Sequence, residues 1–472
     1  MRYLFLIVIL TAATMAAGQS GRGRPAGNSP ATATTAADIT VKQMFEEATA
    51  YLRVKGAEYD AKKVAFSDRL FNQTKLEQRQ LAAKFAATAS MRQGLVGDDF
   101  YYLGMLHWIA ENLDGTAEAL RKFLLTESSE AARRQTARSV LAVVLAKQKR
   151  LDEAELLLAE YLKTEPTKMT ERSRMQGELA KAYQAQKDFI KMAPHAEACY
   201  NAAKALLKDA SSRARGLDEI LDAGMLVYEA FRDIGEQKKA DDALEDMRLT
   251  AAETESPSFY YYAVDQRIKY MIETGRKPGA LEYYQAAINN AAKDFSTKSA
   301  ASNVTDRLKK REKHYKLLGG MAPDLTGIDQ WFPGSPQTMA SLKGKVVLLD
   351  FWATWCGPCF EAFPSLIEWH NDFGRDGLVI LGVTRYYGEA NGLPIDNPHE
   401  ITYLKNFKLR ERLPYDFVVN KDQSSQILYE ATALPTAVLI DRKGIIRYIE
   451  AGTSSTRIEQ MRLMLMKLLA EK

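Results

Sequence analysis

The sequence VVLLDFWATWCGPC occupies residues 346–359. Its first six residues form an apolar run, interrupted only by Asp350, and this run predicts a buried strand. A helical pattern follows, so the two cysteines are expected at the start of a helix. There, unpaired backbone N–H groups and the helix dipole place partial positive charge beside Cys356. Such a setting stabilises a thiolate and lowers the thiol pKa from about 8.5 to roughly 3.5–7.5.

Two cysteines separated by two residues can close a small disulfide reversibly. Pro358 lies early in the predicted helix, where its missing N–H costs little. Gly357 adds no side chain between the sulfurs and a docking partner. The pair could also be a static disulfide or half of a zinc site. Zinc requires further Cys or His ligands, and because the sequence contains no second cysteine pair, no metal is expected.

The segment Asp350–Cys359 resembles the active-site segment of the thioredoxin superfamily. Pro364 lies where these proteins carry a helix-kinking proline, five residues beyond the second cysteine. The dipeptide Leu434-Pro435 precedes an apolar strand and resembles the cis-proline loop that faces the disulfide in this family. Asp350 matches the buried acid beneath the family's active site. The resemblance covers about residues 320–472 and implies an α/β thioredoxin fold.

The opening of this region narrows the resemblance. Ala322-Pro323-Asp324-Leu325 resembles the start of extracytoplasmic thioredoxin-like proteins of the TlpA and ResA kind, and residues 384–412 hold the insertion of that subgroup. ResA-like proteins often carry a glutamate three residues after the second cysteine. Here that position is Ala362, and Glu361 precedes it, so the chain departs from a specialised acid-assisted mechanism.

The resemblance implies a role for each residue of the site. Cys356 is the more exposed nucleophile and Cys359 the more buried resolving thiol of a redox-active disulfide. Asp350, with a pKa raised by burial, takes the proton from Cys359. The alternative for Asp350 is a hydrogen-bonded acid at the end of a strand. Trp355 shields the sulfurs, and Pro435 keeps a docking surface for an extended substrate. A static disulfide would require neither of the last two residues.

The N-terminus predicts a secretory signal peptide over residues 1–18. Arg2 supplies positive charge, residues 3–17 are almost wholly apolar, and small residues precede Gln19. The apolar run is shorter than the ~20 residues of a spanning helix, although an uncleaved anchor is the alternative. Residues 19–38, rich in Gly, Ser, Thr, Ala and Pro, predict a flexible tether. We expect a secreted or periplasmic protein.

Residues 39–318 predict an all-α array, because apolar residues recur there at helical spacing. Residues 141–166 follow the tetratricopeptide spacing closely. Corresponding alanines at 117, 154, 196, 240 and 280 step by 37, 42, 44 and 40 residues, whereas a regular array steps by 34. We therefore predict a tetratricopeptide-like array with a face that holds a protein partner. The alternative is a spacer or a dimerisation scaffold. Cys199 is expected to lie in the core of this array. Residues 317–320 are expected to form a hinge after it.

Charge excludes one class of partner. The chain has 64 basic and 60 acidic residues. It therefore lacks the excess of positive charge that is typical of nucleic-acid-binding proteins. We predict an exported thiol-disulfide oxidoreductase that acts as a reductase of protein disulfides. It is expected to need no cofactor and to receive electrons from a membrane thiol-transfer protein. The alternatives are a non-catalytic protein-binding scaffold and a peroxiredoxin-like peroxidase. A peroxidase would require a Thr-x-x-Cys arrangement, which Thr354-Trp355-Cys356 does not provide.

Overall fold

The computed structural model describes residues 39–126 and 130–471. The expected signal peptide (1–18) and the expected tether (19–38) lie outside the described residues. The chain divides into two compact units, the first ending at Ala243 and the second beginning at Leu244. The domain limits expected from the sequence stay predictions.

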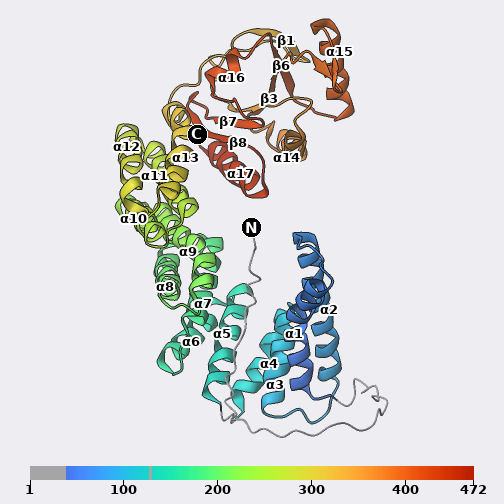
Figure 1. Ribbon diagram of the computed structural model, residues 1–472, viewed down its shortest axis with the longest axis vertical. Coiled ribbons are helices and arrows are strands. Elements are labelled where there is room, and N and C mark those ends of the chain that lie inside the picture. Colours follow the sequence, from blue (N-terminus) through green and yellow to red (C-terminus); the bar gives the residue numbers. More distant parts are fainter. Residues whose placement is uncertain (1–38, 127–129, 472) are drawn as a thin grey trace. The chain divides into compact units, whose positions relative to one another are not determined.

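The first unit is helical throughout its described residues (Figure 1). Helices that follow one another in the sequence pack together, as α3 does on α4, α5 on α6 and α7 on α8. This confirms the predicted all-α array, whereas its tetratricopeptide character stays a prediction. The helices are α1 (Val41–Ala61), α2 (Asp68–Ser90), α3 (Asp98–Ile109), α4 (Leu113–Leu125), α5 (Ala131–Lys147), α6 (Leu151–Lys163), α7 (Met169–Gln186), α8 (Phe189–Lys208), α9 (Arg213–Ile234) and the first part of α10 (Gln237–Glu253).

Small residues allow the paired helices to approach closely. A Cβ atom added to Gly104 of α3 would lie 2.5 Å from Cδ2 of Leu120 on α4, so a larger residue there would force the Leu120 side chain to move. Ala142 and Ala154 are 1% and 0% exposed between α5 and its partner. Small residues are therefore buried where these helices pack together.

The second unit contains helices α11 (Pro257–Glu273), α12 (Lys277–Asp294) and α13 (Lys298–Leu317), followed by an α/β domain. Its main sheet consists of β1 (Ile328–Phe332), β2 (Val346–Phe351), β3 (Leu378–Arg385), β6 (Asp416–Asn420), β7 (Thr436–Ile440) and β8 (Ile446–Ala451). The remaining elements are α14 (Gly357–Phe373), α15 (Asn397–Arg410), α16 (Ser424–Leu428), α17 (Ser455–Ala470) and a small hairpin of β4 (Glu389–Ala390) and β5 (Leu393–Pro394).

The six strands lie in the order β1-β6-β3-β2-β7-β8. β2 is parallel to β3, and β3 to β6, whereas β7 runs antiparallel to both β2 and β8. A parallel β-α-β unit joined to an antiparallel hairpin is the arrangement of the thioredoxin fold expected from the sequence. The predicted strands are present, and β1 is an edge strand that the sequence pattern did not predict.

The central strand β2 carries the site because it is packed on both faces. All six of its residues are buried. Just beyond it, Trp352 stacks on Phe407 of α15 with ring centroids 5.1 Å apart and stands edge-on to Phe363 of α14 at 5.7 Å. Truncating such a buried aromatic ring costs about 3–5 kcal/mol. This aromatic layer holds the start of α14 against the end of β2.

The expected hinge at residues 317–320 is tied to the sheet. The N–H of Gly319 donates to the carbonyl of Ile446 at 2.8 Å, and the N–H of Ile446 donates to the carbonyl of Gly320 at 2.9 Å. Met321 forms a bridge with Ile445. The chain therefore leaves α13 and pairs immediately with β8, which argues against free rotation at this point.

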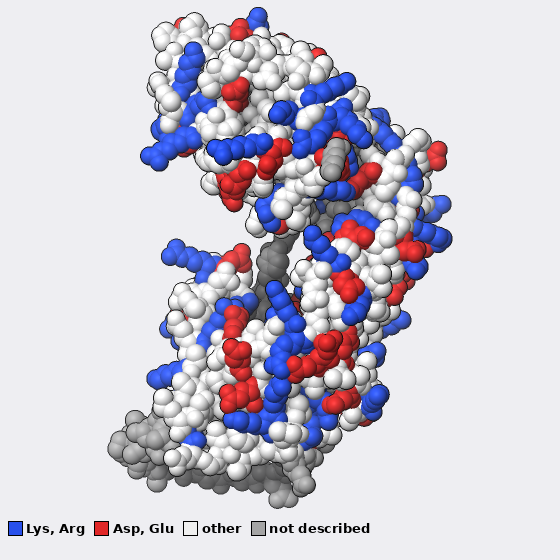
Figure 2. Space-filling model, turned by 180° about the vertical axis from the view of Figure 1, so that it is seen from behind, with Lys and Arg blue, Asp and Glu red and all other residues white. Residues whose placement is uncertain are grey.

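Lys and Arg side chains are interspersed with Asp and Glu on the face drawn in Figure 2. No helix between residues 39 and 126 or between 130 and 471 is long and apolar enough to cross a membrane.

Candidate dithiol site

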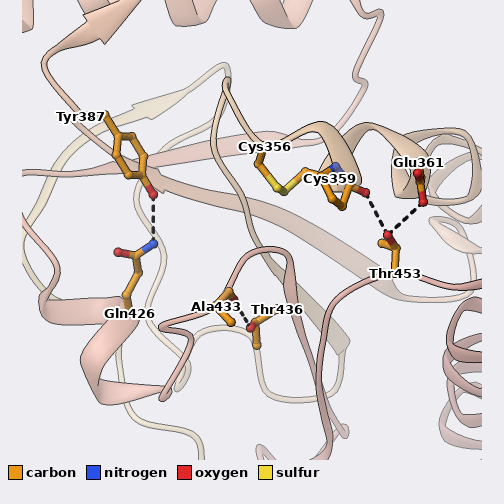
Figure 3. The surroundings of a disulfide bond; sticks show 9 residues. Cys356, Cys359, Glu361, Tyr387, Gln426, Ala433, Thr436 and Thr453 are labelled. Atoms are coloured by element: carbon orange, nitrogen blue, oxygen red, sulfur yellow. Dashed lines mark hydrogen bonds between the residues drawn. A yellow bond between two sulfur atoms is a disulfide. The ribbon is translucent and has the colours of Figure 1, made fainter. Parts of the chain in front are cut away.

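Cys356 and Cys359 form a disulfide at the start of α14 (Figure 3), with an Sγ–Sγ distance of 2.04 Å. Cys356 is the N-cap residue, and Pro358 occupies the first turn. The first sulfur therefore lies at the positive end of the helix dipole, as the sequence predicts. Both cysteines are buried: Cys356 is 4% exposed and Cys359 is 1% exposed. The expected order of exposure is present, but the difference is small.

Asp350 lies at the end of β2, beneath α14, and is 3% exposed. Burial raises the pKa of its carboxyl to about 7. Its Oδ2 atom has no hydrogen-bond partner among the described residues. That Asp350 takes the proton from Cys359, and is not merely an acid at the end of a strand, stays a prediction.

Asp350 faces a cavity of about 20 Å³. Ala362 and Leu366 of α14, Pro435, and Ala437 of β7 contribute to its wall. A volume of ~10–15 Å³ is enough for one water molecule, so the cavity can place a single water between the carboxylate and the helix that carries the cysteines. The rest of the lining consists of Tyr448, Glu450, Gly452, Thr453, Arg457, Ile458 and Met461.

The Leu434–Pro435 peptide bond is cis, as the resemblance implies. Hydrogen bonds hold the loop on both sides of the proline. The Thr436 hydroxyl donates to the carbonyl of Ala433 at 2.6 Å, and the N–H of Gly452 donates to the carbonyl of Pro435 at 2.7 Å. The loop is drawn with the disulfide in Figure 3, and Pro435 shares the cavity wall with Asp350.

Trp355 is 55% exposed, in contrast to its cysteine neighbour. Its indole stands edge-on to the ring of Tyr387, with centroids 5.3 Å apart. The Tyr387 hydroxyl accepts a hydrogen bond from Nε2 of Gln426 at 3.2 Å (Figure 3), and the Arg385 guanidinium lies 4.1 Å from the Tyr387 ring centre. Residues of the insertion therefore hold the tryptophan; that it shields the sulfurs stays a prediction.

Thr453 anchors the first turn of α14 from the loop before α17. Its hydroxyl lies 3.1 Å from the carbonyl oxygen of Pro358 and 3.2 Å from Oε2 of Glu361 (Figure 3). Glu361 is exposed, whereas Ala362 is 5% exposed and lines the cavity. The cavity beside Asp350 is therefore lined by Ala362 at the position where ResA-like proteins often carry a glutamate.

Sequence reasoning missed Tyr387, Gln426, Thr453 and Glu450. None belongs to a motif, and each reaches the site from an element distant in the sequence. Between residues 39 and 126 and between 130 and 471, no cluster of three or more His, Cys, Asp or Glu side chains could hold a metal ion.

Comparisons with known proteins match the C-terminal region of the chain. A model of the AhpC/TSA family matches residues 318–449. The thiol-disulfide oxidoreductase ResA of Geobacillus kaustophilus is 32% identical over 144 residues, which are 30% of this chain and 74% of that protein. Protein DipZ of Mycobacterium bovis is 30% identical over 144 residues, or 30% of this chain and 20% of DipZ. The chain thus spans about a fifth of the length of DipZ.

Among solved structures, a thiol-disulfide isomerase from Corynebacterium glutamicum is 21% identical, with 32% of this chain and 98% of that chain covered and a TM-score of 0.27. A thioredoxin-family thiol:disulfide interchange protein from Chlorobium tepidum is 20% identical, with 32% and 98% covered and a TM-score of 0.26. Through its C-terminal region, the chain belongs to the AhpC/TSA family, beside the thiol-disulfide oxidoreductases named ResA.

Proposed function

We propose that the chain is an exported thiol-disulfide oxidoreductase that reduces disulfides of protein substrates with the Cys356/Cys359 dithiol. One observation carries the proposal: the disulfide lies at the N-terminus of α14, and the same helix lines a cavity together with a buried acid whose pKa is about 7. A static disulfide needs no proton acceptor beneath it. The Gly-Pro pair between the cysteines, which resembles that of reducing thioredoxins, supports the direction of electron flow.

The reaction begins in the reduced protein. The Cys356 thiolate attacks one sulfur of the substrate disulfide, forms a mixed disulfide and releases the other substrate sulfur as a thiolate. Cys359 then gives its proton to Asp350, through one water molecule in the cavity. The Cys359 thiolate attacks Sγ of Cys356 and releases the second substrate thiolate. The substrate gains two electrons, and the chain keeps the Cys356–Cys359 disulfide.

The near-neutral pKa of Asp350 suits this role. A general base works best when its pKa lies near the working pH, because it is then partly ionised and still basic enough to take a proton. An ordinary exposed aspartate, with a pKa of about 3.9, would be a far weaker acceptor. Burial in the cavity therefore prepares the carboxyl for the resolving step.

The helical array, in this proposal, holds the protein substrate or another protein partner. An open depression of about 570 Å³ in the first unit supports it. Asp114, Glu118, Arg121 and Arg150 surround this depression and could pair with charges of either sign. A scaffold could use the same surface, so this feature does not decide between the two functions.

Export and a membrane electron donor are further parts of this proposal. Residues 1–18 support a secretory address, and each turnover leaves a disulfide that must be reduced again. A membrane thiol-transfer protein is the class of donor that we propose for this step.

Trapping with a Cys359→Ser variant tests the proposal. The variant keeps Cys356 but cannot resolve, so it should accumulate a mixed disulfide with a protein that carries an accessible disulfide. Non-reducing electrophoresis should show the adduct, and dithiothreitol should remove it. Cys356→Ser is the matched control and should give no adduct. If neither variant forms one, the chain is a scaffold.

A further inference from the structure

Four residues lie in one row across the sheet. Asp350 pairs with Gly382 of β3 and with Ala437 of β7, and Ala437 pairs with Glu450 of β8. Directly paired residues point their side chains to the same face. Asp350, Ala437 and Glu450 indeed line the same cavity. Two strand spacings separate the two acids, so their positions are about 10 Å apart with only a methyl group between them.

Glu450 is held by two cations from the helices that precede the α/β domain. Arg311 of α13 donates from Nη2 to Oε1 at 2.9 Å and from Nη1 to Oε2 at 3.2 Å. Lys269 of α11 also pairs with Glu450, and it binds Asp265 at 2.7 Å. The Arg311 and Glu450 side chains are only 10% and 13% exposed. Water therefore screens these charges weakly.

The charges of this cluster balance. Asp265 and Glu450 carry two negative charges, and Lys269 and Arg311 carry two positive ones. Burial and the nearby Arg311 lower the pKa of His314, so it is neutral at pH 7. It lies 3.2 Å from Arg311 and 3.1 Å from the Glu430 carbonyl.

Other titratable groups also approach the two acids. Burial raises the pKa values of four tyrosines, so these side chains remain neutral. Arg457 of α17 lines the cavity and donates a hydrogen bond to the carbonyl of Ala451. The tyrosines are Tyr261, Tyr315, Tyr415 and Tyr448. Gly382 leaves β3 without a charge opposite Asp350.

We infer that Arg311 and Lys269 are positioning residues for the dithiol, because they neutralise Glu450 and so let Asp350 accept the Cys359 proton without an opposing charge across the cavity. This inference rests on the proposed function and deepens it. Helices α11 and α13 then belong to the redox machinery, and their role goes beyond holding a partner. The α/β domain alone would lack the cations that balance Glu450.

The inference predicts the sign of each charge change. Without Arg311 the cluster has one excess negative charge, which opposes ionisation of Asp350. Two unit charges about 10 Å apart, at an effective dielectric constant of about 20, change a pKa by about one unit. Glu450→Gln leaves one excess positive charge and should act in the opposite direction. The double variant is balanced again.

The test follows the reduced full-length chain, in a Cys199→Ser background, as it reacts with a symmetrical aromatic disulfide. Attack by Cys356 releases the first aromatic thiolate, and resolution by Cys359 releases the second, so stopped-flow absorbance separates the steps. The pH at which the second step reaches half its maximum rate is compared between the background protein and Arg311→Met, Glu450→Gln and the double variant. Lys269→Met provides a second route should Arg311→Met fail to fold.

We expect the pH midpoint of the second step to rise by about one unit in Arg311→Met and to fall in Glu450→Gln. In the double variant it should return to the value of the background protein. In an Asp350→Asn background these differences should vanish. A midpoint that is unchanged, or that moves in the same direction in both single variants, would overturn the inference. A background protein that never releases the second thiolate would instead overturn the proposed function.

Discussion

Trp355 and Tyr387 form an edge-to-face pair beside the disulfide, with ring planes at 90° and centroids 5.3 Å apart. The tryptophan adjoins the first cysteine, and the tyrosine lies just beyond β3. Since Trp355 is 55% exposed, this contact limits the positions that the indole takes in front of a docking substrate. Aromatic pairs of this geometry contribute about 0.5–1.5 kcal/mol.

Removing the tyrosine ring should therefore weaken the reaction with protein disulfides. We expect Tyr387→Ala to lower kcat/KM about two- to tenfold, the range that corresponds to the loss of such a pair. Tyr387→Phe is the matched control, because it keeps the ring and loses only the hydrogen bond from Gln426. Insulin reduction measures both. Equal losses in the two variants would show that the hydrogen bond, not the aromatic pair, is responsible.

Asp350 should make stability depend on pH. Burial raises its pKa in the folded chain to about 7, from an ordinary value of 3.8. Because the folded state then binds this proton more tightly than the unfolded state does, stability is lost as the pH rises from about 4 to about 7.

Asp350→Asn removes this loss, since asparagine does not ionise. The variant should gain up to roughly 4 kcal/mol over the native sequence at pH 8, and almost nothing near pH 4. Thermal unfolding of the two oxidised proteins at both pH values measures the difference. A gain of the same size at pH 4 and pH 8 would contradict a raised pKa for this carboxyl.

Gly382 is a position where an added side chain would be tightly packed. A Cβ atom there would lie 3.1 Å from Nε1 of Trp352 and 3.1 Å from Cδ1 of Phe417. Gly382→Ala should destabilise the chain by about 1–3 kcal/mol, as overpacking usually does. Gly357→Ala is the control, because no atom lies within 4 Å of the added carbon. Melting temperatures should separate the two variants, and similar values would mean that the core adjusts freely.

Cys199 should be inert in the folded chain. It is 5% exposed, and burial raises the pKa of its thiol to about 11. Thiol counting on the oxidised protein at pH 8 should therefore detect no reactive thiol before denaturation and one afterwards. Rapid labelling of the native protein would show that the core around α8 opens.

The sequence predicted the elements whose signal is local. The apolar runs of β2 and β7 mark buried strands, and the CxxC motif marks the start of α14. β1 was missed because Ile328–Phe332 is a half-exposed edge strand without a regular pattern. Its Trp331 indole instead donates to Oδ2 of Asp416, at the start of another strand.

The site residues that the sequence did not predict make contacts with residues distant in the sequence. Arg311 and Glu450 are 139 residues apart in the sequence, and Tyr387 and Gln426 are 39 apart. Neither pair has a spacing that a motif could reveal. The hinge expected near Gly319 is a further case. The helical pattern ends there, but Gly319 pairs with Ile446, on a strand more than a hundred residues later in the sequence.

The reduction potential of the Cys356/Cys359 pair tests the central claim most directly. The full-length chain is equilibrated in thiol buffers of defined potential, and its free thiols are counted in a Cys199→Ser background. A reductase should have a value near or below about −270 mV. A value of roughly −180 to −120 mV would contradict that direction and indicate an oxidase or isomerase, and a pair that never exchanges would contradict catalysis altogether.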